Sequence, residues 1–236
     1  MKVRRKALIK GVFFDLFFTL ILPRYPADRK ECDVLGMSVE EWERYAEEEN
    51  LYRERALGMV KSESEILERI TLQIPVHITP EQRAEVLSRR EQRMRSAFLE
   101  VPELVLEVLN ELRKSHIKIG LISNCDRIDI KFWDQSRLAG FFDDAVFSCE
   151  VGLLKPDEKI YRLALNRLGL RASECVFVGD GGSDELKGAK KAGMKTVFSE
   201  ALLQKTKREQ RELMASADVH IQQFDQLLRI VSHSVL

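Results

Sequence analysis

The sequence has no excess of charge of either sign, because 38 lysines and arginines balance 38 aspartates and glutamates among its 236 residues. A neutral chain offers no field that attracts nucleic acid or an anionic membrane, so we expect neither as a partner. Cysteine is scarce and scattered. The four cysteines form no C-x-x-C pair, which argues against a zinc site and against a disulfide framework. We therefore expect reduced thiols and a cytoplasmic protein.

Long apolar runs are also missing. The stretch that comes nearest to one, residues 7–22, is interrupted by Lys10 and Asp15. Each charge would cost about 2.5–3.5 kcal/mol at the centre of an inserted helix, and no small-residue cleavage site follows. We expect neither export nor membrane insertion. The remaining composition, with 44% apolar and 32% charged residues, is that of a globular protein of one or two domains.

Short apolar runs recur along the chain and predict buried strands. They are almost continuously apolar, which is typical of parallel strands that helices cover on both faces. Helical patterns stand between them at residues 103–115, 157–168 and 184–192. This alternation predicts an α/β fold with a Rossmann-like parallel sheet. The predicted strands are residues 7–14, 117–122, 145–148, 175–178, 195–198 and 218–221.

Residues 23–100 contain no comparable strand pattern. Ser38 and Glu41 have the spacing of a capping box at the start of a helix. We predict an all-helical insert at residues 23–100 and an α/β core made of residues 1–22 and 101–236. The predicted helices of the insert are residues 38–50, 63–70 and 81–98.

Polar residues follow three of the predicted strands. Asp15 follows the first strand, Ser123 and Asn124 follow the second, and Asp180 follows the strand at residues 175–178. Ligands of open parallel sheets bind outside the carboxyl ends of the strands, so we expect these side chains to converge. Two buried carboxylates repel each other unless a cation lies between them. Mg²⁺ suits such a site, because it binds one or two carboxylates together with a substrate phosphate.

Other basic residues are open to a simpler interpretation. Lys155 precedes Pro156, and could face the same crevice or lie on the surface ahead of a helix. Taken alone, it fits the surface position better. A basic segment near the C-terminus is interleaved with Glu and Gln, which is typical of a solvated helix face. Contact with an anionic substrate or RNA is the alternative for this segment, which contains Lys205, Lys207, Arg208 and Arg211.

Four short motifs combine these residues in a fixed order. They are FFDLFFTL at 13–20, ISN at 122–124, KP at 155–156 and VGDGGSDE at 178–185, followed by LKGAKKAGM at 186–194. Each motif alone is weak, but in this order and strand context they resemble the haloacid dehalogenase (HAD) superfamily of hydrolases. The resemblance extends from about residue 7 to residue 231. It implies a HAD-like core, and it identifies the helical insert as similar to a type 1 cap, which covers the site and selects substrates.

The resemblance implies a catalytic role for each matching residue. Asp15 would be the nucleophile that attacks phosphorus and forms an aspartyl-phosphate. Ser123 and the backbone N–H of Asn124 would hold phosphoryl oxygens. Lys155 would neutralise the charge that develops on the transferring group.

The resemblance also implies Mg²⁺ as the cofactor. Asp15, Asp180 and the backbone carbonyl of Phe17 would ligate it. The second acid of the last motif is either Asp184 or Glu185. We favour Asp184, which would bind the outer shell of the metal or orient the motif lysine.

Phe17 and Phe18 depart from the phosphatase pattern. Phosphatases of the family carry aspartate and glycine there, and the aspartate side chain is the general acid/base. Phe17 keeps the backbone carbonyl but has no proton to give. Dehalogenase members of the family carry a tyrosine at this position, but they have serine-type residues in place of Gly179 and Asp180. The pair of carboxylates therefore favours a phosphatase.

We expect a HAD-like hydrolase, namely a Mg²⁺-dependent phosphatase that acts on a small phosphorylated metabolite. The missing acid/base side chain predicts slow or specialised activity. Two alternatives stay open. One is a 2-haloacid dehalogenase-type hydrolase that needs no metal, and the other is a binding or scaffold protein with vestigial catalysis. The substrate and the oligomeric state are also open.

Overall fold

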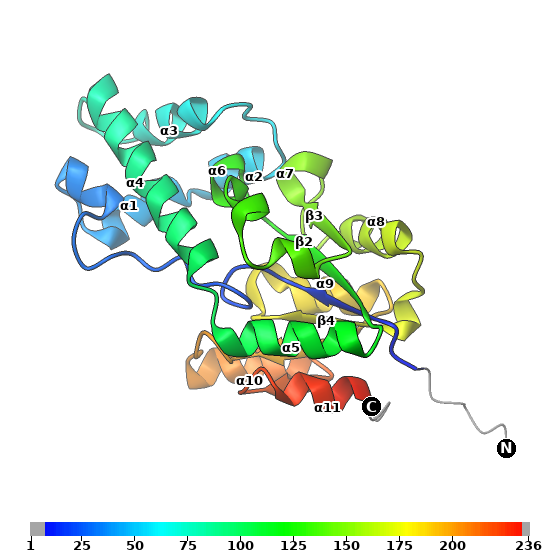
Figure 1. Cartoon of the computed structure of the whole chain (residues 1–236). Helices are drawn as coiled ribbons and strands as arrows, with labels where there is room; N and C mark the ends of the chain where they lie inside the picture. The colour runs from blue at the N-terminus through cyan, green and yellow to red at the C-terminus, as the bar shows by residue number, and fades with distance from the viewer. Residues whose placement is uncertain (1–7, 233–236) are drawn as a thin grey trace, which may run out of the picture.

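The predicted α/β class is confirmed by a computed structural model that describes residues 8–232 (Figure 1). Six parallel strands form one sheet in the order β3-β2-β1-β4-β5-β6. Every predicted strand is present, although the first residue predicted for β1, and residues 1–7 and 233–236 of the predicted core, lie outside the described residues. The strands are β1 (Gly11–Phe14), β2 (Lys118–Ser123), β3 (Asp144–Phe147), β4 (Cys175–Gly179), β5 (Lys195–Ser199) and β6 (Val219–Ile221).

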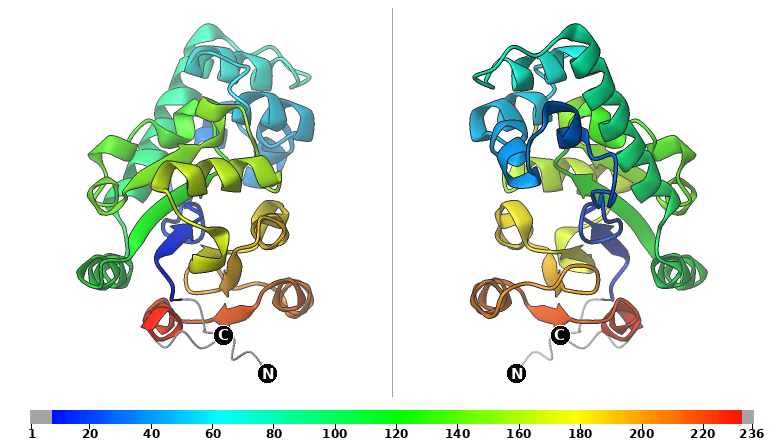
Figure 2. Two further views of the ribbon diagram at one scale, coloured as in Figure 1. Left: turned by 90° about the vertical axis from the view of Figure 1, so that its right-hand side faces the viewer. Right: turned by 90° about the vertical axis from the view of Figure 1, so that its left-hand side faces the viewer.

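Helices cover both faces of the sheet, as the apolar strands predicted (Figure 2). On one face lie α5 (Glu103–Lys114) and α11 (Gln226–Ser232). On the other lie α8 (Glu158–Leu168), α9 (Glu185–Lys191) and α10 (Lys207–Ser216). All residues of the central strands β1 and β4 are buried, so their two faces contribute to two separate apolar clusters. Within residues 8–232, no helix combines the length and the apolar character needed to cross a bilayer.

The segment between β1 and α5 is helical wherever the structure gives it regular secondary structure, and it has an apolar core of its own. Trp42, Ile66 and Val86 belong to this core. The predicted capping box is confirmed, since Ser38 Oγ accepts from the Glu41 N–H at 3.1 Å and Glu41 accepts from the Ser38 N–H at 3.0 Å. The elements are η1 (Glu31–Leu35), α1 (Val39–Ala46), α2 (Glu49–Ala56), α3 (Glu63–Thr71) and α4 (Pro80–Leu99).

The prediction of one helix over residues 38–50 is wrong. The chain forms two helices there, α1 and α2, because the carboxylate of Glu48 caps the second one. It accepts hydrogen bonds from the backbone N–H groups of Asn50 at 3.1 Å and Leu51 at 2.8 Å. Such a cap satisfies N–H groups that have no partner inside a helix, and thereby favours a new helix start.

Buried ion pairs join the helical insert to the core. Arg55 of α2 and Arg90 of α4 meet Asp126 and Asp129, which lie at the N-terminal end of the short helix α6 (Arg127–Ile130). Arg90 Nη2 lies 2.9 Å from Asp129 Oδ1 and 3.3 Å from Asp126 Oδ2, and all four side chains are at most 10% exposed. Burying such a pair costs desolvation free energy, and removing one partner leaves the other charge buried without a counter-ion. The insert is therefore held to the core in a defined orientation.

A close backbone contact also joins the two parts. Gly58, just after α2, has a φ of +69°, and a Cβ built there would lie 1.9 Å from the carbonyl oxygen of Cys149 in α7 (Ser148–Val151). Only glycine fits, because both the conformation and the space exclude a side chain.

We predict that Gly58→Ala destabilises the protein by roughly 2–5 kcal/mol, through the left-handed φ and the overlap with α7. Gly36→Ala is the matched control, because Gly36 has a φ of +66° with no atom within 4 Å of the built Cβ. It should cost only the conformational part, about 1–2 kcal/mol. Urea unfolding measures both. Equal losses would contradict a close approach of α2 to α7.

Candidate active site

The polar strand ends converge at one edge of the sheet, as predicted. β1 lies between β2 and β4, so Asp15 follows β1 beside the ends of the strands that lead to Asn124 and Asp180. The backbone N–H of Asp15 donates to the carbonyl of Val178 at 2.9 Å, which extends the strand ladder to the aspartate itself. The sheet thus fixes the position of the Asp15 backbone, from which the carboxylate extends.

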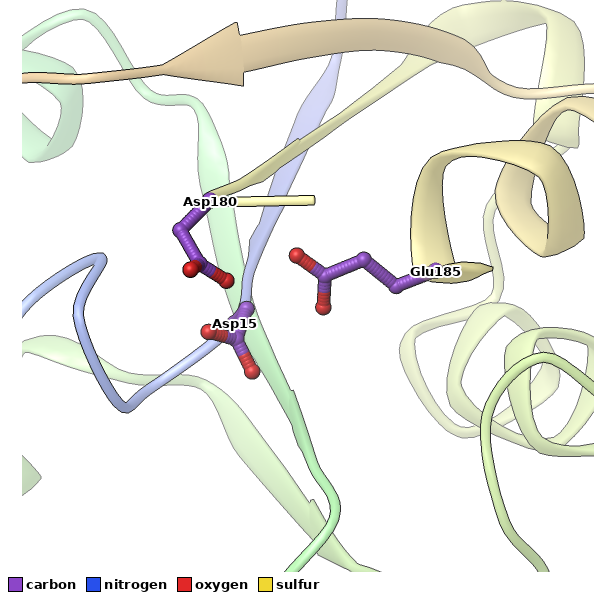
Figure 3. Close-up of side chains that lie close together, drawn as sticks. All are labelled: Asp15, Asp180 and Glu185. Atoms are coloured by element: carbon purple, nitrogen blue, oxygen red, sulfur yellow. The ribbon is translucent and has the colours of Figure 1, made fainter. Parts of the chain in front are cut away.

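Three carboxylates meet at this edge (Figure 3). One oxygen each of Asp15, Asp180 and Glu185 lies within 4.8 Å of the others, and all three residues are buried. The preference for Asp184 does not agree with this geometry. Its side chain is 64% exposed and pairs with Lys187 at 2.7 Å. The backbone before α9 explains the difference, because Asp184 stands before the helix in the left-handed region, whereas Glu185 begins the helix and turns toward the sheet.

Lys155 lies at the centre of this cluster and not on the surface. Its Nζ contacts Asp15 Oδ1 at 2.5 Å and Glu185 Oε2 at 2.6 Å, with only 2% of the side chain exposed. Glu185 also accepts from the backbone N–H of Gly181 at 3.0 Å. Two carboxylates that come from different elements therefore share one ammonium.

Burial dominates the electrostatics of the cluster. It raises the pKa of Asp15 although Lys155 opposes the shift, and it raises the pKa of Glu185 to about 8, assisted by the negative charge of Asp15. Burial alone would lower the pKa of Lys155, but the two carboxylates hold it above its ordinary value. The carboxylates are thus short of positive charge, which is the condition that a divalent cation relieves. The oxygen donors of these carboxylates fit Mg²⁺, a hard cation that prefers oxygen ligands.

Ser123 and Asn124 lie at the end of β2, but in different surroundings. Ser123 is fully buried and does not reach the cavity, whereas Asn124 lines it. The Asn124 side chain accepts from the Lys155 N–H at 2.8 Å and donates to the Lys155 carbonyl at 3.0 Å. Asn124 thus fixes the main chain of the lysine, a contact that none of the motifs predicts.

Phe17 and Phe18 form a tight turn above Asp15. Phe18 has a φ of 62°, and its N–H donates to the Ile21 carbonyl at 2.7 Å. Its ring is not packed away, since the residue is 39% exposed and lines the cavity. Phe17 packs partly against the apolar core. The hydroxyl of Thr19 donates to Asp15 Oδ2 at 3.0 Å, so the turn orients the aspartate.

The cluster forms the floor of a cavity of about 420 Å³ between the sheet edge and the helical insert. The floor includes Asp15, Lys155 and Asp180. The wall contributed by the insert carries aromatic groups and charges of both signs. The residues of this wall are Pro23, Tyr25, Glu43, Glu47, Tyr52, Arg90, Arg93 and Met94.

Lys205 is a site residue that we had assigned to a solvated face. Its Nζ lies 2.6 Å from Asp180 Oδ2, and its side chain is 15% exposed. It stands in the loop between β5 and α10, one residue before the helix cap Thr206. No local pattern separates it from the exposed basic residues that follow, because only the path of the loop brings it to the sheet edge.

The backbone at Phe18 stores strain, because a bulky residue is costly in the left-handed region. We predict that Phe18→Gly is more stable than Phe18→Ala by about 1 kcal/mol. Both variants remove the ring, so the comparison isolates the backbone. Thermal unfolding measures the difference, and an alanine variant at least as stable as the glycine variant would refute the strained turn.

Comparison with known proteins gives matches over most of the chain. A sequence model of haloacid dehalogenase-like hydrolases matches residues 9–193. A glyceraldehyde 3-phosphate phosphatase of Methanopyrus kandleri is 30% identical over 198 residues, which cover 80% of this chain and 83% of that protein. The protein of the same name from Methanocaldococcus jannaschii is 40% identical over 95 residues, which is 39% of this chain and less than half, 41%, of that protein.

A solved structure with the same fold is a HAD family enzyme of Bacteroides thetaiotaomicron in complex with magnesium and inorganic phosphate. It matches with a TM-score of 0.64 at 18% identity, over 85% of this chain and 98% of that one. This likeness concerns the fold, while the sequence matches concern ancestry. Together with the order of the motifs at the sheet edge, they show that the chain belongs to the haloacid dehalogenase-like hydrolases.

Proposed function

We propose that this protein is a Mg²⁺-dependent phosphatase that hydrolyses a small phosphorylated metabolite through an aspartyl-phosphate at Asp15. One observation carries the proposal: the Asp15 carboxylate is buried at the floor of the cavity, in contact with Lys155 and within 4.8 Å of two further carboxylates. The names of relatives such as the Methanopyrus kandleri phosphatase support the same class of substrate.

Asp15 acts as the nucleophile. Its Oδ1 contacts Lys155 and its Oδ2 accepts from Thr19, so both oxygens are held by donors before a substrate arrives. One oxygen attacks phosphorus, the bond to the leaving oxygen breaks, and the leaving oxygen departs with the electron pair and takes up a proton from solvent water. A water molecule then attacks the phosphorus of the aspartyl-phosphate and gives a proton back to solvent, which releases phosphate and restores the carboxylate.

Asp15, Asp180 and Glu185, with the backbone carbonyl of Phe17, would hold Mg²⁺ at the sheet edge. When bound, the ion supplies positive charge next to the phosphoryl oxygens. Glu185 takes the place that we had assigned to Asp184. Lys155 contributes a further positive charge at the same point, and the Asn124 N–H would hold a phosphoryl oxygen. Ser123 is buried and does not line the cavity, so we assign it no contact with the phosphoryl group.

Residues 23–100 act as the cap domain of this site, on residues 1–22 and 101–236 as the core. The cap supplies the cavity wall that faces the substrate, and Glu43 and Glu47 are the carboxylates on that wall. We further propose a cytoplasmic location, which the four free, buried cysteines support.

A panel of aryl and alkyl phosphates, with Mg²⁺ and with EDTA, tests the function. We predict turnover with Mg²⁺ and none with EDTA, and loss of turnover by at least about 10³-fold in Asp15→Asn, because an amide is a poor nucleophile. Asp184→Asn is the matched control, since that side chain is exposed and outside the cluster. It should retain activity within about twofold.

Activity that persisted in EDTA with 2-haloacids would indicate dehalogenase chemistry. Binding of phosphate and Mg²⁺ without turnover of any substrate would indicate a binding protein. Residual activity of Asp15→Asn within about tenfold of the starting protein would exclude Asp15 as the nucleophile.

The leaving-group dependence tests the consequence of Phe17. A positioned general acid contributes typically about 10²–10⁴-fold, and alkyl phosphates need it most because alkoxides are strongly basic. We predict a steep decrease in rate as the pKa of the leaving group rises, and a shallower one in Phe17→Asp. Aryl phosphates serve as the internal control, because they need little protonation. Equal slopes for the two proteins would show that another group, such as Glu43 of the cap, already supplies the proton.

A further inference from the structure

Lys205 and Asp180 form an ion pair that the four motifs do not account for. Nζ of Lys205 lies 2.6 Å from Oδ2 of Asp180, and the two side chains are 15% and 8% exposed. The other oxygen of Asp180 accepts from the backbone N–H of Gly182 at 3.1 Å. A lysine thus occupies one oxygen of a carboxylate that we assign to the metal site.

The main chain of Lys205 is held independently of this ion pair. Its N–H donates to Glu200 Oε1 at 3.0 Å. The other oxygen of Glu200 contacts Gln210 at 2.7 Å and His220 at 2.6 Å. Glu200 thereby ties the loop to α10 and to β6. The lysine side chain can leave Asp180 by rotation about its own bonds, while the loop keeps its position.

The charges of the cluster explain why the ammonium of Lys205 lies beside Asp180. Lys155 contacts Asp15 and Glu185, whereas Lys205 contacts Asp180 and so is the counter-ion of the third carboxylate. A divalent cation bound by the same three carboxylates would meet this ammonium at short range. Two cations at such a distance repel each other strongly inside a protein, where screening is weak.

We propose that Lys205 is a tethered counter-ion that competes with the divalent metal for Asp180 and so sets the metal affinity of the site. The inference rests on the proposed metal site. Lys205 also lines the cavity. When a metal displaces its ammonium from Asp180, an anionic group of the substrate is the next available partner. Metal and phosphorylated substrate should therefore assist each other's binding, a coupling that is reciprocal.

Calorimetric titration with Mg²⁺ alone tests the competition. We predict that Lys205→Met binds Mg²⁺ about tenfold more tightly than the unaltered protein, because the competing charge is gone. Lys205→Gln, which retains a hydrogen-bond donor without the charge, should show the same gain in Mg²⁺ affinity. It replaces Lys205→Met in the test if the methionine variant does not fold. Lys205→Arg, which retains the charge, should bind like the unaltered protein.

Lys187→Met is the matched control, because it removes a lysine that is 59% exposed and paired with Asp184 outside the cluster. Its Mg²⁺ affinity should change less than about twofold. Repeating the titrations with inorganic phosphate gives a second readout. Phosphate should raise the Mg²⁺ affinity of the unaltered protein by a larger factor than that of Lys205→Met.

The outcomes separate this inference from the proposed function. Equal Mg²⁺ affinity in the unaltered protein and both neutral variants would overturn the competition and leave the metal site intact. Weaker binding in both variants would also overturn it, and would assign Lys205 the positioning of Asp180 instead. Absence of Mg²⁺ binding in all the proteins, with circular dichroism showing that they are folded, would overturn the metal site and the inference together.

Discussion

The site depends on the buried contact of one ammonium, that of Lys155, with two carboxylates. Asp15 follows the central strand β1 and Glu185 begins α9, so the lysine joins two elements that are 170 residues apart in the chain. Buried carboxylates destabilise the fold without such a partner, and removal of the lysine would leave both of them without a counter-ion. Two neighbouring residues position the partners of this contact. Asn124 fixes the main chain of Lys155, and Thr19 orients the second oxygen of Asp15. Positive charge at the sheet edge is thus part of the fold as well as of the chemistry.

A second set of buried charges connects the insert to the same region. Arg55 and Arg90 reach Asp126 and Asp129 immediately after the strand end that carries Asn124. The Nε atoms of both arginines make no hydrogen bond with any described residue, so the network is costly in desolvation. Its effect is geometric, because it orients the insert over the cavity through the segment that also positions the lysine backbone.

The turn at Phe17 and Phe18 shows how a motif can change its chemistry and keep its backbone. The left-handed conformation that suits glycine is retained by Phe18, whose ring faces the cavity. Phe17 packs partly against the apolar core and also lines the cavity. The turn therefore still orients Asp15 through Thr19, but it brings apolar surface to the cavity at the position where the motif pattern predicts an acid.

The sequence by itself determined the sheet, the helical character of the segment between β1 and α5, and the convergence of Asp15, Asn124 and Asp180. These follow from local patterns: unbroken apolar runs, capping residues, and the rule that parallel strands end at one edge. Only the tertiary structure decided that Glu185 and not Asp184 enters the cluster, because that choice depends on the turn by which α9 begins. It also brought Lys205 to Asp180, since the course of a loop between distant elements leaves no periodic trace in the sequence. Local patterns report which residues are buried together, whereas the pairing of particular charges is set by the packing of the whole chain.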